Sequence, residues 1–103
     1  MVIEFLRFTV TAELREQFVR LDSDIWTPVL AATSGFLGKE VWISPDDLTE
    51  VVVIVHWETF EAWQSIAQAS LQQTEETFSQ AMGDTYTLIE SKQYQVRKFF
   101  PAL

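Results

Sequence analysis

The segment from Val51 to Trp57 constrains the fold more than any other part of the chain. It reads Val-Val-Val-Ile-Val-His-Trp, so β-branched or aromatic residues stand at both odd and even positions. Side chains alternate between the two faces of a strand, and a strand that is apolar at both parities is expected to be covered on both faces. Helices on one side of a small sheet cover only one face. The sequence therefore predicts a second layer over the other face, most simply the sheet of a second copy.

The composition indicates one acidic, globular domain. The chain has 103 residues, of which 48% are apolar and 14% aromatic, too many for a disordered chain. Its net charge of −8 opposes binding to nucleic acid or anionic membranes, because both rely on clustered Lys and Arg. No segment approaches the roughly 18 apolar residues of a membrane span, and residues 1–10 lack the basic start of a signal peptide. We expect a cytoplasmic protein without nucleic-acid or membrane partners.

The residues that commonly bind metals are sparse. Cysteine is absent and histidine occurs once, at position 56. The lack of cysteine excludes a disulfide framework, a thiol nucleophile and iron–sulfur ligation. His56 and Glu58 lie two residues apart and can face the same way, but metal centres generally need three or four ligands. We therefore predict no metal site, and no cofactor.

The first half of the chain reads as a strand, a broken helix and a second strand. Residues 2–10 form the predicted first strand, and Thr11 is placed to cap the helix that follows it. That helix is expected to bury a stripe at helical spacing, made of Leu14, Phe18, Leu21 and Ile25. Pro28 has no backbone N–H, so the helix should kink or restart near residues 24–27 and stop at Gly35. Residues 36–44 are the predicted second strand.

The second half continues with a hairpin, further helix and a last strand. Residues 50–57 are expected to pair with the second strand across a turn at residues 45–47. Thr59 is predicted to cap one helix, and Ser70 with Gln73 has capping-box spacing for another that Gly83 ends. Residues 85–91 read as the fourth strand. Residues 93–100 are expected to form an extended C-terminal arm.

This order, β-α-β-β-α-β, is that of the ferredoxin-like α+β fold, an antiparallel sheet with its helices on one face. Residues 51, 53, 55 and 57 are predicted to face the helices, although the reverse parity is also open. The face away from the helices is then expected to expose Ile3, Phe5, Trp42, Val52, Ile54, His56, Tyr86 and Leu88. Monomers rarely expose apolar patches above a few hundred Å². We therefore predict an obligate homodimer with its sheets face to face and its C-terminal arms exchanged.

Two segments carry a family resemblance. Ile25-Trp26-Thr27-Pro28-Val29-Leu30 leads to Gly35-Phe36-Leu37-Gly38-Lys39-Glu40-Val41-Trp42, and the other reads His56-Trp57-Glu58-Thr59-Phe60-Glu61-Ala62-Trp63. Both are similar to the dimeric α+β barrel superfamily of antibiotic-biosynthesis-monooxygenase-like proteins, and most similar to a branch of short, uncharacterised, largely cyanobacterial members. The resemblance covers nearly all of residues 1–103 in element order, and implies one dimeric α+β barrel domain.

The resemblance also implies where a ligand would lie. Members include cofactor-independent oxygenases of polycyclic aromatics and haem-degrading enzymes, both with a pocket between sheet and helices. The haem-degrading members use an asparagine and an axial histidine on the helix after the Trp motif. This chain has no asparagine and no histidine after His56, so neither haem ligation nor asparagine-assisted oxygenation carries over. Trp57 alone occupies a family-typical position.

Six residues are candidates for function from the sequence itself. His56 is the one side chain whose ordinary pKa suits acid–base work near neutrality, but we favour a structural histidine that is hydrogen-bonded within or beside the dimer contact. With Arg7 and Glu40 it is expected to form a polar cluster on the face away from the helices, and because buried charges need partners we favour a salt-bridge network between subunits over a wet cavity. The candidates for a ligand cavity are aromatic: Trp26, Phe36, Trp57, Phe60 and Trp63. The alternative is that these aromatic residues belong to the hydrophobic core, as aromatic residues at helical spacing usually do.

Three functional hypotheses remain open at this point. The first is a homodimer of undetermined function that binds a small apolar or aromatic molecule between helices and sheet. The second is a cofactor-independent oxygenase or isomerase of such a molecule, with Trp57 and Trp63 positioning it and His56 moving a proton. The third is a purely structural or partner-binding dimer. A cavity of roughly 300 Å³ or more with a convergent polar group distinguishes the first two from the third.

Overall fold

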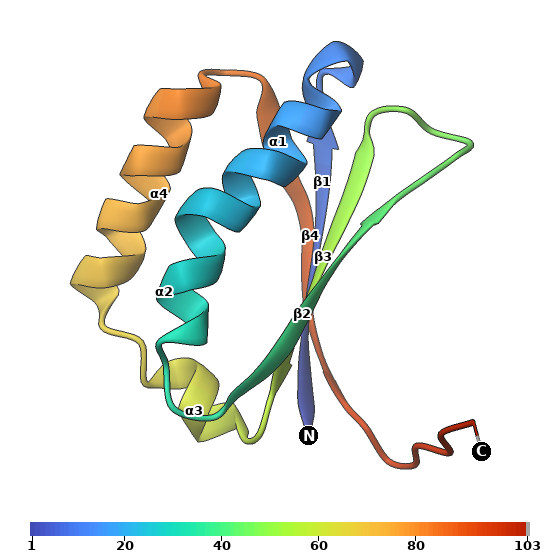
Figure 1. The fold of residues 1–103 in the computed structure, drawn as a ribbon, viewed down its shortest axis with the longest axis vertical. Helices are drawn as coiled ribbons and strands as arrows, with labels where there is room; N and C mark the ends of the chain where they lie inside the picture. The colour runs from blue at the N-terminus through green and yellow to red at the C-terminus, as the bar shows by residue number, and fades with distance from the viewer. Residues whose placement is uncertain (103) are drawn as a thin grey trace.

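A computed structural model, which describes residues 1–102, has four strands and a layer of helices (Figure 1). In chain order its elements are β1 (Val2–Val10), a 3₁₀ turn η1 (Ala12–Leu14), α1 (Arg15–Leu21), a π-helical turn η2 (Asp22–Trp26), α2 (Thr27–Ala31), β2 (Phe36–Ile43), β3 (Glu50–Trp57), α3 (Phe60–Gln64), α4 (Gln68–Met82) and β4 (Tyr86–Gln95). The strands form one antiparallel sheet in the order β2-β3-β1-β4. The predicted α+β fold class is confirmed.

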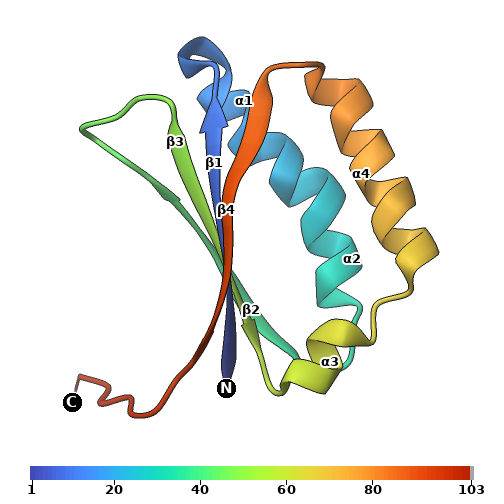
Figure 2. The same cartoon turned by 180° about the vertical axis from the view of Figure 1, so that it is seen from behind.

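All of the helices lie on one side of the sheet, as the two opposite views show (Figures 1 and 2). Val51, Val55 and Trp57 face this layer and are completely buried. Phe18 on α1 and Phe78 on α4 pack against each other edge-on, with ring centroids 5.2 Å apart, and join the same core. The predicted parity of β3 is therefore correct.

The helix breaks where the sequence predicts. The π-helical turn η2 ends at Trp26, and α2 begins at Thr27 with Pro28 in its first turn, where the missing N–H costs no helical hydrogen bond. The chain then turns at Gly35, whose φ of +93° favours glycine, and enters β2. This break matters because it directs Asp22 and Trp26 toward the sheet.

The predicted caps are partly correct. The Thr59 hydroxyl accepts a hydrogen bond from the Ala62 N–H at 3.0 Å, and Gly83 ends α4 with a φ of +67°. Thr11 makes no side-chain cap, since its hydroxyl bonds the carbonyl of Thr85 instead. The capping box at Ser70 is also wrong, because α4 already begins at Gln68.

The outer face of the sheet, away from the helices, differs from the predicted apolar surface. Val52 and Ile54 are only 8% and 4% exposed within a single chain. Longer side chains on the paired strands flank them: Arg7 and Trp42 stand beside Val52, and Phe5 and Glu40 beside Ile54. Burial of β3 on both sides therefore does not by itself require a second sheet, and the homodimer stays a prediction.

Two residues predicted on the outer face lie on the helix side. Tyr86 pairs with Val10 and Leu88 with Phe8, whose side chains point toward the helices. A register shift in the β1–β4 pairing between Arg7 and Phe8 then reverses the parity of β4. As a result Tyr94, opposite Ile3, comes to the outer face, where its ring meets that of Phe5 edge-on at 6.2 Å.

The last strand is longer than predicted. β4 continues to Gln95, and the N–H of Val96 still bonds the carbonyl of Met1 at 3.0 Å. The segment after it leaves the sheet on the side away from the helices (Figures 1 and 2). Phe99 and Phe100 on this segment are 73% and 85% exposed.

Candidate functional site

A cavity of about 460 Å³ lies between the sheet and the helices. It exceeds the roughly 300 Å³ that distinguishes a binding protein from a filled core. Its walls come from β1, β2, β3, β4 and every helix of the layer, and most lining groups are apolar. Four exposed lining residues mark the open side, on α3, α4 and β4: Gln64, Gln68, Glu75 and Leu88.

A polar row crosses the floor of the cavity. Glu4 on β1 pairs with Val55, and Val55 pairs with Lys39 on β2, so all three side chains share the helix-facing side. The Trp57 indole N–H donates a hydrogen bond to Oε1 of Glu4 at 3.1 Å. Burial raises the pKa of Glu4, while the Trp57 hydrogen bond and the Lys39 charge partly oppose this. Glu4 is thus a carboxylate held in place by the core.

Lys39 makes the second polar contact of the cavity wall. Its Nζ lies 2.6 Å from Oδ2 of Asp22 and donates a hydrogen bond to the Thr27 hydroxyl at 3.0 Å. The side chains of Lys39 and Asp22 are only 6% and 7% exposed. The Lys39 ammonium group therefore lies directly against the Asp22 carboxylate as a buried ion pair. Burial raises the pKa of Asp22 and Lys39 acts against the rise.

Aromatic side chains supply much of the remaining wall. Trp26 follows the π-helical turn and Trp63 lies on α3, and both line the cavity. Tyr86 lines it from β4 and donates a hydrogen bond from its hydroxyl to Oε1 of Glu75 at 2.7 Å. Burial, then the Glu75 contact, strongly raises the pKa of Tyr86, so its phenol stays protonated.

The other aromatic candidates stand behind this wall. Trp57 is completely buried and reaches the cavity only through its bond to Glu4. Phe36 packs edge-on against Trp57 at 5.8 Å, and Phe60 against Trp63 at 5.7 Å. Of the five predicted ligand-binding residues, the structure brings Trp26 and Trp63 to the cavity surface, and a binding role for them stays a prediction.

His56 lies on the outer face, away from the cavity. It pairs with Ile3 and Gly38, and its Nε2 lies 2.7 Å from Oε2 of Glu40. The hydrogen bonds from His56 and then from Trp42 lower the pKa of Glu40. His56 therefore lies outside the cavity lining, on the face away from the helices, and its two predicted roles stay predictions.

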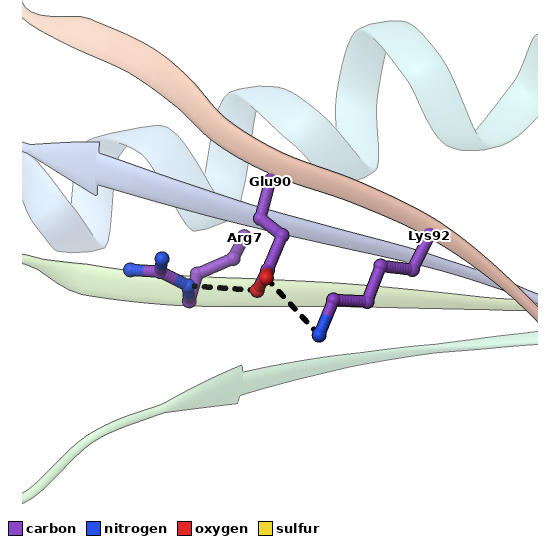
Figure 3. Close-up of polar contacts among 3 residues, drawn as sticks. All are labelled: Arg7, Glu90 and Lys92. Atoms are coloured by element: carbon purple, nitrogen blue, oxygen red, sulfur yellow. Dashed lines mark hydrogen bonds and ion pairs between the residues drawn. The ribbon is translucent and has the colours of Figure 1, made fainter.

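Arg7 shares the outer face with His56 and Glu40, as predicted, but pairs with different residues. Its Nε lies 3.3 Å from Oε1 of Glu90, and the other oxygen of Glu90 is 3.0 Å from Nζ of Lys92. Figure 3 shows Glu90 held between the two cations. The outer face thus carries two separate polar groups, each held together by contacts within the chain.

Within residues 1–102 no three His, Asp or Glu side chains gather closely enough to hold an ion. No helix in the same range is long and apolar enough to cross a membrane.

Glu4, Asp22 and Lys39 line the cavity but were not among the residues predicted from the sequence. The sequence does mark each of them, because each is a charged residue on a strand or helix face that is otherwise apolar. Glu4 shares its parity with Val2 and Leu6, and Asp22 follows Phe18 by one helical turn. A charge on a buried face needs a partner or a ligand.

Comparison with known proteins gives a family and a fold. The family model described as "Antibiotic biosynthesis monooxygenase" matches residues 1–82. No curated protein matches the chain in sequence. Among solved structures, SnoaB, a cofactor-independent oxygenase from Streptomyces nogalater, is 20% identical with a TM-score of 0.72, over 98% of this chain and 97% of that one.

Two further structures share the fold. A putative antibiotic biosynthesis monooxygenase from Deinococcus radiodurans is 16% identical with a TM-score of 0.75, over 100% of this chain and 99% of its own. A monooxygenase from Streptomyces coelicolor, in complex with the ligand nanaomycin D, is 20% identical with a TM-score of 0.73, over 98% of this chain and 92% of its own. Identities this low establish the fold alone.

Proposed function

The chain belongs to the antibiotic biosynthesis monooxygenase family, and from this premise we propose that it binds a small, planar, largely apolar molecule between its helices and its sheet. The observation that carries the proposal is the cavity of about 460 Å³ with aromatic walls and a polar row on its floor. Aromatic walls bury planar molecules well, and a few convergent polar groups fix their orientation. A purely structural dimer has no need of such a cavity.

Calorimetric titration with 1,4-naphthoquinone and with nanaomycin D tests this proposal. We expect saturable binding to the wild-type protein and its loss in Leu71→Trp, because Leu71 lines the cavity and a larger ring fills it. Leu48→Trp is the matched control, since Leu48 is 59% exposed and lies outside the cavity. Urea denaturation of both variants checks that they fold. Absence of saturable binding, or equal binding by Leu71→Trp, contradicts the proposal.

A second candidate is cofactor-independent oxygenation of the bound molecule, and Glu4 favours it. A carboxylate of raised pKa inside the cavity is suited to accept a proton from a carbon activated by flanking aromatic rings. Dioxygen is the co-reactant: the CH₂ group and O₂ give C=O and H₂O, so one oxygen atom enters the product and the other leaves as water. In this proposal Glu4 takes the proton-transfer role that the sequence analysis assigned to His56.

Oxygen consumption with anthrone as the probe tests this second candidate. A general base typically contributes about 10²- to 10⁴-fold to the rate, so Glu4→Gln should lower turnover of anthrone to anthraquinone by that order. Glu13→Gln removes an equal charge at an exposed position outside the cavity and should leave turnover unchanged. Turnover that survives Glu4→Gln rules out Glu4 as the base.

We also propose that two copies associate through their outer faces. Trp42 and Tyr94 are each 49% exposed there, and Arg7 and Lys92 both contact Glu90 within one chain. The projecting segment after Gln95 leaves on the same side, toward such a partner (Figure 2). Sedimentation should show a dimer, and Trp42→Asp should give monomers. A folded wild-type monomer at micromolar concentration contradicts this part of the proposal.

A further inference from the structure

The charges around the cavity are unevenly balanced. Among its lining residues, all within the described range 1–102, three are acidic and one is basic: Glu4, Asp22, Glu75 and Lys39. Lys39 lies directly against Asp22, 2.6 Å away. The direct partners of the other two carboxylates are uncharged, since Glu4 accepts from an indole N–H and Glu75 from a phenol. Glu4 and Glu75 are therefore two carboxyl groups of the cavity without a cation in direct contact, and the three acidic groups outnumber the one Lys39 cation.

The apolar part of the cavity reinforces this bias. Its wall includes six aromatic rings: Phe8, Phe18, Trp26, Trp63, Phe78 and Tyr86. The faces of Trp, Tyr and Phe rings attract cations, and the attraction grows when the cation is withdrawn from water. Carboxylates set among aromatic rings are the combination that binds organic ammonium groups. The same carboxylates repel an organic anion. The low polarisability of the cavity strengthens this repulsion.

We propose that the cavity selects a planar aromatic molecule that carries a protonated amine, held between Glu4 and the tryptophan wall, and that it rejects the corresponding carboxylate. This inference rests on the proposed function and narrows it to a ligand class. Glu4 sets the preference for the ammonium group because it lies on the cavity floor. Trp57 donates a hydrogen bond to Oε1 of Glu4, and within residues 1–102 no side chain donates one to Oε2.

Four naphthalenes of one shape test the proposal by calorimetric titration at neutral pH. They are 2-naphthylmethylammonium, 2-naphthol, 2-methoxynaphthalene and 2-naphthoate, which differ mainly in charge and hydrogen bonding. We expect the ammonium compound to bind at least about tenfold more tightly than the carboxylate, with 2-naphthol between them. Glu4→Gln should reduce that ratio severalfold.

The control separates the cavity from the overall charge of the protein. Glu13→Gln changes the net charge of −8 by the same amount at an exposed site, and should leave the ratio unchanged. A ratio that falls equally in both variants overturns the assignment to Glu4, because it then reports only the general field of an acidic protein.

The remaining outcomes distinguish this inference from the function on which it rests. Equal binding of all four compounds, or tightest binding of 2-naphthoate, overturns the charge preference and leaves the binding function standing. Failure of all four, together with failure of the quinones, contradicts the binding function and the inference with it.

Discussion

Replacing Gly35 by alanine tests how the turn before β2 supports the cavity wall. Gly35 has a φ of +93°, a conformation that costs an L-residue about 1–2 kcal/mol. A Cβ at this position would overlap the Cβ of Ala62 on α3. The carbonyl of Gly35 also accepts a hydrogen bond from the N–H of Glu58 at 2.8 Å. The turn and α3, which carries Trp63, are thus packed without spare room.

The magnitude follows from these two costs. Overpacking of a close contact typically costs about 1–3 kcal/mol, so with the backbone cost the free energy of unfolding should fall by about 2–5 kcal/mol. Gly38→Ala is the matched control, because φ is not positive there and no atom lies within 4 Å of the added Cβ. It should change stability by no more than about 0.5 kcal/mol. Urea denaturation followed by tryptophan fluorescence measures both.

A double-mutant cycle isolates the overlap itself. Ala62→Gly removes the obstructing Cβ, so the loss caused by Gly35→Ala should shrink by about 1–3 kcal/mol in that background. The backbone cost should remain. If Gly35→Ala unfolds at the urea concentration of the wild-type protein, or if its effect is the same with and without Ala62→Gly, then the close packing of this turn against α3 is refuted.

Three further predictions concern the polar groups of the site. Thr59→Ala removes the bond to the Ala62 N–H and should cost about 1 kcal/mol in urea denaturation, which Thr59→Ser should largely restore. Lys39→Met leaves Asp22 buried without its cation and should cost about 3–5 kcal/mol; adding Asp22→Asn should recover much of it, and no recovery would contradict the pairing. Burial raises the pKa of Glu4 above its ordinary 4.5, so the folded protein binds that proton more tightly than the unfolded chain. The stability from Glu4 is therefore fully present below pH 4.5 and is lost as pH rises through the folded-state pKa. Glu4→Gln should remove this component from urea midpoints measured across that range, and parallel pH profiles would contradict it.

The sequence alone determined the order of the elements and the alternation of faces along the central strand, and the tertiary structure decided which parity faces the helices. Val51, Val53, Val55 and Trp57 alternate along β3 in a pattern that one helical layer satisfies, and Pro28 and Gly35 mark the break and the turn. These features depend on neighbours within a few residues, which is why periodicity and local backbone chemistry predict them.

The composition of the cavity was decided only by the tertiary structure. Glu4, Asp22 and Lys39 are far apart in the chain. Strand register and the π-helical turn together bring all three to the lining of one cavity. Likewise Tyr86 faces the cavity through its pairing with Val10, and the register shift beside Arg7 turns Tyr94 to the outer face. A one-residue change in pairing moves a side chain to the opposite face of a sheet, and no local pattern encodes that choice. The layers therefore follow from the sequence pattern, whereas the chemistry of the cavity follows from how the strands align.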